Sequence, residues 1–450
     1  MTENSGNIKE SLEEFVKQAL QSYAEAQGVT LPKMTILIER PKVKEFGDFA
    51  SNAAMQTVKI FKKNPMEIAE GIKERIPPSP LIGEISIAKP GFINFRLNPA
   101  ASGIALKTIL AQGADFGRVN VGNGKKVLIE FMSANPTGPL HIGHARNAIL
   151  GDSIARILNA AGYAVTREYY YNDAGVQMKN LGLSLQARYR QALGEDVPFP
   201  EDGYQGDYMK EIAQMLVAEK GDSLKSTQET QAFTQFAADH IIKLIDADMR
   251  ALGIYFDNWF SEASLHKNGK VDRALDRLAQ QGMLYEKDGA TWLRSEQFGD
   301  EKDRVVIKSD GEKTYIMPDI AYHQDKFERG YDILINVLGG DHHGYVPRLK
   351  AGVQALGFDA ARLHCIVFQM VTLLKDGEQI KLSTRAGKFI TLKNAIDELG
   401  ADVVRFFFLM RGADSQMTFD WQLAKDHSMN NPVFYVQYAH ARCCSLFKKA

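Results

Sequence analysis

Cysteine is scarce in this chain of 450 residues. The three cysteines, Cys365, Cys443 and Cys444, form neither a CxxC pair nor an even-numbered framework. Adjacent cysteines such as the last two are also poor disulfide partners for one another. Because disulfides persist mainly in oxidising compartments, this pattern suits a reducing environment, and the sequence predicts a cytoplasmic protein.

Long apolar runs are missing too. A transmembrane helix needs about 20 consecutive apolar residues, and no stretch of the sequence approaches that length. Residues 1–10 also lack the apolar centre of a secretory signal peptide. We therefore expect no membrane partner.

Neither sign of charge is in excess. The chain carries 54 Lys and Arg against 55 Asp and Glu, which gives a formal net charge of −1. No global field therefore draws it toward nucleic acid, so any RNA-binding surface must be a local patch.

Two common nucleotide-binding signatures are absent from the sequence. The lack of G-x-x-x-x-G-K-[ST] disfavours a P-loop, and the lack of G-x-G-x-x-G after a strand disfavours NAD. Signatures of a Ser/His/Asp or Cys/His nucleophile are missing as well, so we expect chemistry without a side-chain nucleophile.

The apolar content is ample, with 45% hydrophobic residues, and 450 residues favour two to four domains. Residues 1–110 read as a small α+β unit that begins with an amphipathic helix over 8–26. A larger α/β unit over 120–390 follows, with an insertion at about 176–310. A connecting helical segment over 391–430 leads to an aromatic-rich helix over 431–450, which we expect to be the truncated start of another helical domain.

The α/β unit opens with a short apolar run that ends at Glu130, a tight loop, and a helix from Gly143 to about residue 161. His141 and His144 stand at the start of that helix, where free backbone N–H groups and the helix dipole favour phosphate. An isolated His-x-x-His pair is usually an ordinary surface feature, but the preceding strand and turn favour a nucleotide site. Zinc is disfavoured because no third ligand lies nearby in the sequence.

Pro139-x-His141-x-Gly143-His144 after a strand resembles the HIGH signature of class I aminoacyl-tRNA synthetases. The motifs around it resemble those of arginyl-tRNA synthetase of the bacterial type. In chain order these motifs are Phe46-Gly47-Asp48-Phe49, Glu130-Phe-x-Ser-x-Asn135-Pro136, His141-x-Gly-His-Ala-Arg146, Tyr170-Tyr171-Asn172-Asp173-Ala174-Gly175, Phe256-Asp257-x-Trp259-Phe260-Ser261-Glu262 and Gly340-Asp341-His342-His343-Gly344-Tyr345.

The resemblance implies a Rossmann-like parallel-sheet catalytic domain with an inserted subdomain. A small N-terminal α+β domain that contacts tRNA would precede it, and the start of an anticodon-binding helical bundle would follow. The implied activity is ATP-dependent activation of L-arginine and its transfer to the 3′-terminal adenosine of tRNA(Arg), which releases AMP and pyrophosphate. The implied partners are ATP with Mg²⁺, L-arginine and tRNA(Arg), with no structural metal in the protein and a monomeric state.

A second class signature, the KMSKS loop, has a counterpart in Lys381-Leu-Ser383-Thr384-Arg385. The resemblance assigns ATP binding to Pro139, His141, Gly143, His144, Lys381 and Ser383, and catalysis to His141, His144, Lys381, Ser383 and Arg385. Thr384 stands where the second lysine is expected. A lysine ahead of the HIGH histidine often compensates in relatives, but Thr137 occupies that region here.

A guanidinium requires a planar carboxylate partner, because it donates in a bidentate geometry. The family's arginine-binding positions fall on Glu130, Ser133, Asn135, Tyr315, Asp319 and His342. Without the resemblance, Asp319 would read as a helix-start residue and Glu130 as a charge at a strand end. Two alternatives stay open: a class I synthetase for another amino acid, and a catalytically inactive relative that binds tRNA.

Overall fold

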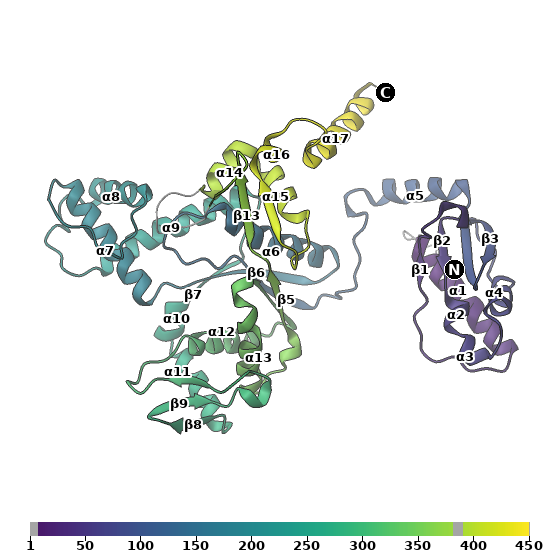
Figure 1. Ribbon diagram of the computed structural model, residues 1–450, viewed down its shortest axis with the longest axis horizontal. Coiled ribbons are helices and arrows are strands. Elements are labelled where there is room, and N and C mark those ends of the chain that lie inside the picture. The colour runs from purple at the N-terminus through teal and green to yellow at the C-terminus, as the bar shows by residue number, and fades with distance from the viewer. Residues whose placement is uncertain (1–7, 381–389, 450) are drawn as a thin grey trace. The chain divides into compact units, whose positions relative to one another are not determined.

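The computed structural model describes residues 8–380 and 390–449 (Figure 1). The chain forms two compact units, one that ends at Arg118 and one that begins at Val119. Each unit has its own hydrophobic core and is described by itself. Among the described helices, none combines the length and the apolar character that crossing a bilayer requires.

The first unit is an antiparallel sheet in the order β1-β2-β4-β3 packed with helices. Its core joins the apolar face of α1, including Leu12 and Val16, to Ile93 and Phe95 of β4, as the helical spacing in 8–26 predicts. The elements are α1 (Ile8–Ala26), β1 (Ile38–Glu39), β2 (Phe49–Ser51), α2 (Ala53–Gln56), α3 (Val58–Phe61), α4 (Pro65–Lys73), β3 (Ile82–Ala88) and β4 (Phe92–Leu97).

Helix α5 (Pro99–Gln112) follows β4 and runs through the predicted domain boundary at residue 110. Asn98 caps this helix, since its side chain accepts from the backbone N–H of Ala100 at 3.0 Å. Pro99 takes the first helical position, where its missing N–H costs nothing. The unit ends at Arg118, several residues after the helix.

The second unit is built on a parallel sheet of five strands in the order β12-β11-β5-β6-β7. From β5 (Lys126–Glu130) the chain passes through α6 (Ile142–Ala160) to β6 (Ala164–Tyr171) and on to β7 (Asn258–Ser261). It returns on the other side of β5 with β11 (Ile333–Gly339) and β12 (Leu363–Phe368). The expected parallel α/β sheet is therefore confirmed.

Two subdomains leave this sheet between β6 and β11 (Figure 1). One is a helical bundle of α7 (Gly175–Ala192), α8 (Asp207–Lys220) and α9 (Gln231–Ala251). The other packs α10 (Glu262–Lys267), α11 (Lys270–Gln280) and α12 (Ile316–Glu328) beside an antiparallel sheet of β8 (Leu284–Lys287), β9 (Ala290–Leu293) and β10 (Arg304–Ile307).

The insertion expected at about 176–310 is interrupted by β7, which lies within that range and pairs with β6 in the central sheet. A strand of only four residues shows no periodicity that a sequence could reveal. Residues 314–317 have a strand-like composition, yet α12 begins at Ile316.

The chain after β12 builds a small sheet in the order β14-β13-β15 against α6. The connecting helical segment expected over 391–430 begins with two helices, α14 and α15, because Gly400 adopts a positive φ of 85° between them. The remaining elements are α13 (Val346–Ala355), β13 (Val371–Lys375), β14 (Glu378–Ile380), α14 (Leu392–Leu399), α15 (Ala401–Leu409), β15 (Met417–Asp420), α16 (Trp421–Lys425) and α17 (Pro432–Lys449).

Candidate active site

The strand order of the central sheet reverses direction between β5 and β11, which is where an open α/β sheet forms its ligand crevice. Glu130 ends β5, and Asn336 of β11 is its partner in the parallel register. The chain leaves these strands into the loop 131–141 and into the 3₁₀ turn η4 (Gly340–Tyr345). The candidate site lies at these carboxyl ends.

The loop after β5 holds two consecutive residues in the left-handed region, Met132 with φ 74° and Ser133 with φ 43°. Such conformations are uncommon for side-chain-bearing residues and persist only where neighbours hold them. Here Asn147 of α6 accepts from the Met132 N–H at 2.9 Å, and the Ser133 hydroxyl donates to Glu130 Oε1 at 3.0 Å. The loop is thus fixed to both the helix and the strand end.

His141 and His144 meet face to face at the start of α6, with ring centroids 3.7 Å apart and an angle of 20° between the planes. The His141 backbone N–H donates to His144 Nδ1 at 3.2 Å, so the neutral His144 ring carries its proton on Nε2. Burial, with the adjacent His141, lowers the pKa of His144 to about 3. Burial also lowers the pKa of His141, so neutral rings face the helix start at pH 7.

The residues around the histidines pair with the segment that follows residue 389. The Leu392 N–H donates to the Leu140 carbonyl at 2.7 Å, and Thr391 forms a β-bridge with His141. Gly143 lies in the first turn of α6, and Pro139 is partly exposed two residues before His141. The predicted site residues Lys381, Ser383 and Arg385 lie outside the described residues.

Three carboxylates from three elements converge behind the loop. Glu130 Oε2 accepts from Lys326 Nζ of α12 at 2.5 Å. Asp319, also on α12, accepts from the Tyr345 hydroxyl, and Glu262 of α10 accepts from the Tyr170 hydroxyl.

Asp319 is a carboxylate of this cluster whose pKa is strongly raised. Burial, together with the negative charges of Glu262 and Glu130, raises the pKa of Asp319 to about 7 against the opposing effects of Tyr345 and Lys326. Burial likewise raises the pKa of Glu262. An arriving cation would reverse this penalty, so the cluster is a site for a positively charged group.

A cavity of about 900 Å³ opens beside these acids. Asn135 and Glu262 line it, together with Tyr315, whose side chain is 84% exposed at the rim. Asn135 donates to Gln177 at 2.8 Å, which ties the rim to α7. His342 is exposed on η4, and its Nδ1 contacts Asp341 Oδ1 at 2.9 Å.

Within residues 8–380 and 390–449, no group of three or more His, Cys, Asp and Glu side chains is arranged to hold a metal ion.

Comparisons with known proteins identify the family of this chain. Residues 105–406 match the family described as tRNA synthetases class I (R), catalytic domain. Residues 7–97 match the family described as arginyl tRNA synthetase N terminal domain. The chain belongs to the arginyl-tRNA synthetase family.

Relatives of the arginyl-tRNA synthetase family match almost the whole chain. The arginine–tRNA ligase of Bacillus licheniformis is 48% identical, across 98% of this chain and 80% of its own length. That of Citrifermentans bemidjiense is 50% identical, across 98% and 81%. The Thermus thermophilus arginyl-tRNA synthetase structure, 22% identical, shares the fold with a TM-score of 0.70, across 98% of this chain and 82% of its own.

In this arginyl-tRNA synthetase, sequence reasoning missed four side chains of the candidate site: Lys326, Glu262, Tyr345 and Tyr170. Glu262 and Tyr345 end motifs that carry the resemblance, and Tyr170 begins another. Lys326 gave no signal, because a lysine on an amphipathic helix ordinarily reads as a solvent-facing charge. Its full burial depends on the contact of α12 with β5, which only the tertiary structure supplies.

Proposed function

We propose that this chain uses ATP to activate L-arginine as arginyl-adenylate and then transfers the arginyl group to the 3′-terminal adenosine of tRNA(Arg). The observation that carries the proposal is a buried acid cluster at the end of β5, which one short loop joins to the stacked histidines at the start of α6. This arrangement supports a site for a cation and a site for phosphates at the two ends of the same loop. The arginine carboxylate attacks the α-phosphorus, and pyrophosphate leaves.

His141 and His144 serve this step as neutral donors. Because the pKa of each ring is lowered, neither offers a full positive charge at pH 7. The Nε2–H of His144 and the helix dipole instead stabilise phosphate oxygens by hydrogen bonding. Positive charge must come from Mg²⁺ that enters with ATP and from the loop residues Lys381 and Arg385, with Ser383 as a further donor.

Glu130 and Asp319 take the guanidinium of arginine, with Ser133 and Asn135 orienting the substrate around them. Tyr315 at the rim of the cavity and His342 on η4 are the remaining residues predicted to bind arginine. Lysine offers one nitrogen where arginine offers a planar fork, so it would leave a buried carboxylate partly unpaired. This difference accounts for the choice of arginine over lysine.

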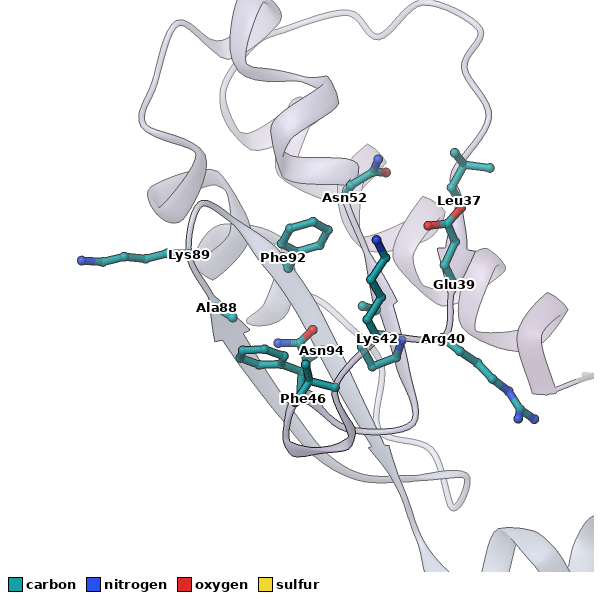
Figure 2. Close-up of a pocket in the computed structure, with 13 residues that line it drawn as sticks. Leu37, Glu39, Arg40, Lys42, Phe46, Asn52, Ala88, Lys89, Phe92 and Asn94 are labelled. Atoms are coloured by element: carbon teal, nitrogen blue, oxygen red, sulfur yellow. The ribbon is translucent and has the colours of Figure 1, made fainter.

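The first unit contacts tRNA through a cavity of about 370 Å³. Phe46 and Phe92 line it with exposed rings, and Asn94 lies between them (Figure 2). Lys42 and Lys89 belong to the same lining. Aromatic faces stack on unpaired bases while lysines meet phosphates, which is the usual chemistry of single-stranded RNA recognition.

We further propose that the chain acts as a monomer in the cytoplasm. Equilibrium sedimentation at micromolar concentrations tests the monomeric state, since a dimer would have twice the chain mass of 50.2 kDa.

The deciding experiment is arginine-dependent ATP–pyrophosphate exchange, measured with and without tRNA(Arg). We expect exchange with arginine, a loss of at least about 100-fold in His141→Ala, and a raised arginine KM in Asp319→Ala. Exchange that another amino acid stimulates better would support a different synthetase. A complete lack of exchange, alongside retained tRNA binding, would support the inactive relative instead.

A further inference from the structure

Lys326 is a cation enclosed by the protein beneath the acid cluster. The residue has 0% exposure, and its Nζ donates to Glu130 Oε2 at 2.5 Å and to Asn336 Oδ1 at 3.0 Å. Its Nζ also lies 4.1 Å from the ring centroid of Tyr322. A buried ammonium is costly unless it is paired and hydrogen-bonded, so these contacts hold it at one point.

The contacts of Lys326 determine how Glu130 faces the crevice. Lys326 occupies one lone pair of Oε2, and the Ser133 hydroxyl occupies one lone pair of Oε1. A carboxylate has about four acceptor positions, two on each oxygen. One position therefore remains on each oxygen, which is the arrangement that a bidentate guanidinium requires.

The same buried chain of hydrogen bonds reaches the second acid. Asn336 Oδ1 accepts from Lys326, so its amide Nδ2 donates to His323 Nε2 at 2.8 Å. His323 Nδ1 then donates to the Asp319 carbonyl at 2.7 Å. The helix turn that carries Asp319 and the strand end that carries Glu130 are thus connected through Lys326.

We propose that Lys326 is a positioning residue that holds the Glu130 carboxylate in place, so that the pocket binds the guanidinium of arginine and discriminates against lysine. This inference rests on the proposed function. It adds a residue that never touches the substrate, since Lys326 acts through Glu130.

The charges around Asp319 predict how the loss of the Lys326 side chain would affect arginine binding. Asp319 is faced by Glu130, Glu262 and Tyr345 as well as by Lys326, and the lysine is the cation among these that lowers its pKa. Without Lys326, Asp319 would hold its proton more readily in the buried cluster. Arginine binding would then weaken at pH 7 and recover as the pH rises.

The test compares Lys326→Met with Lys326→Arg, using arginine titration calorimetry and pyrophosphate exchange with tRNA(Arg) present. We expect Lys326→Met to raise the Kd and KM for arginine about 10- to 100-fold at pH 7. The KM for ATP should stay within about twofold, and Lys326→Arg should recover most of the loss because it keeps the charge. The control is Lys270→Met, which removes another lysine–carboxylate pair, between Lys270 of α11 and Asp325 of α12, outside the pocket.

A double variant separates positioning from a general structural role. Glu130→Gln with Lys326→Met removes both partners of the buried pair, which leaves no unpaired charge to prevent folding. If Lys326 acts through Glu130, this double variant binds arginine no more weakly than Glu130→Gln alone at a pH high enough to ionise Asp319 in both variants. The role of Lys326 would be overturned if the losses in arginine affinity of the two single variants multiply in the double variant. It would also be overturned if Lys326→Met and Lys270→Met had the same arginine KM. A wild-type chain without arginine-dependent exchange would instead overturn the proposed function.

Discussion

Arg146 of α6 is the residue whose replacement should disturb the second unit most. Its side chain is buried, with 1% exposure, and its guanidinium meets three backbone carbonyls: Gln369 at 2.6 Å, Gly412 at 2.8 Å and Ser415 at 2.9 Å. Gln369 precedes β13, and the other two precede β15. One arginine therefore attaches the helix that begins at the histidines to the segments that lead into β13 and β15, two of the three strands of the small sheet.

The magnitude follows from these three bonds. A hydrogen bond to a charged group contributes about 1.5–3 kcal/mol, and a buried carbonyl left without a donor costs about 1–3 kcal/mol. Because water will enter and satisfy part of the carbonyls, we expect Arg146→Met to lower the free energy of unfolding by at least about 3 kcal/mol. Arg146→Lys should recover only part, since one ammonium cannot reach three carbonyls that a planar fork reaches.

Tryptophan fluorescence during urea unfolding measures this change in the second unit alone. The three tryptophans, Trp259, Trp292 and Trp421, all lie beyond residue 118, and Trp421 is fully buried beside the small sheet. The matched control is Arg250→Met, which removes an exposed ion pair on α9 and should change little. Equal unfolding midpoints for the Arg146 and Arg250 variants would refute the role given to the three carbonyl contacts.

Three further predictions concern other parts of the molecule. Because the pKa of Asp319 is raised to about 7 and a guanidinium binds the ionised form, the arginine KM should fall about tenfold per unit as the pH rises toward 7 and then level off. Asp319→Asn should flatten that profile, and an unchanged slope would contradict the assignment. Gly151→Ala places a Cβ 2.2 Å from the ring of Phe131, so thermal or urea unfolding should show a loss of about 2 kcal/mol despite the better helix propensity of alanine. Asn64→Ala removes the acceptor for the Met66 N–H at the start of α4, and hydrogen exchange in the first unit should report a loss of about 1 kcal/mol.

Long periodic segments were predictable from the sequence because their pattern is local. The helix over 8–26 and the strand–helix–strand unit around α6 repeat apolar residues over enough turns or positions to fix their type. Strand β7 was missed because its four residues acquire their identity from pairing with β6, far away in the sequence. The residues at 314–317 look strand-like, yet they lead into α12, whose buried face is set by contacts with α11 and α13.

Part of the candidate site was likewise predictable from the sequence, and part was not. The histidines and Glu130 were identified from motifs that occupy one short stretch, and the structure brings that stretch to the reversal point of the sheet. The charge environment was not predictable, because the partners of Glu130 and Asp319 come from α12 and η4. Roles for the residues of the loop 381–389 remain predictions from the resemblance alone.

The return of β11 to the side of β5 also governs the order in which the protein can fold on the ribosome. Lys126 and Asp332, joined by a 2.8 Å hydrogen bond, lie 206 residues apart, and Glu130 lies 196 residues before Lys326. At about 5–20 residues per second, synthesis of that interval takes on the order of 10–40 s. Throughout this time Glu130 lacks its internal cation and one edge of β5 lacks its neighbour. The nascent chain must therefore protect an exposed strand edge until the residues of β11 have emerged.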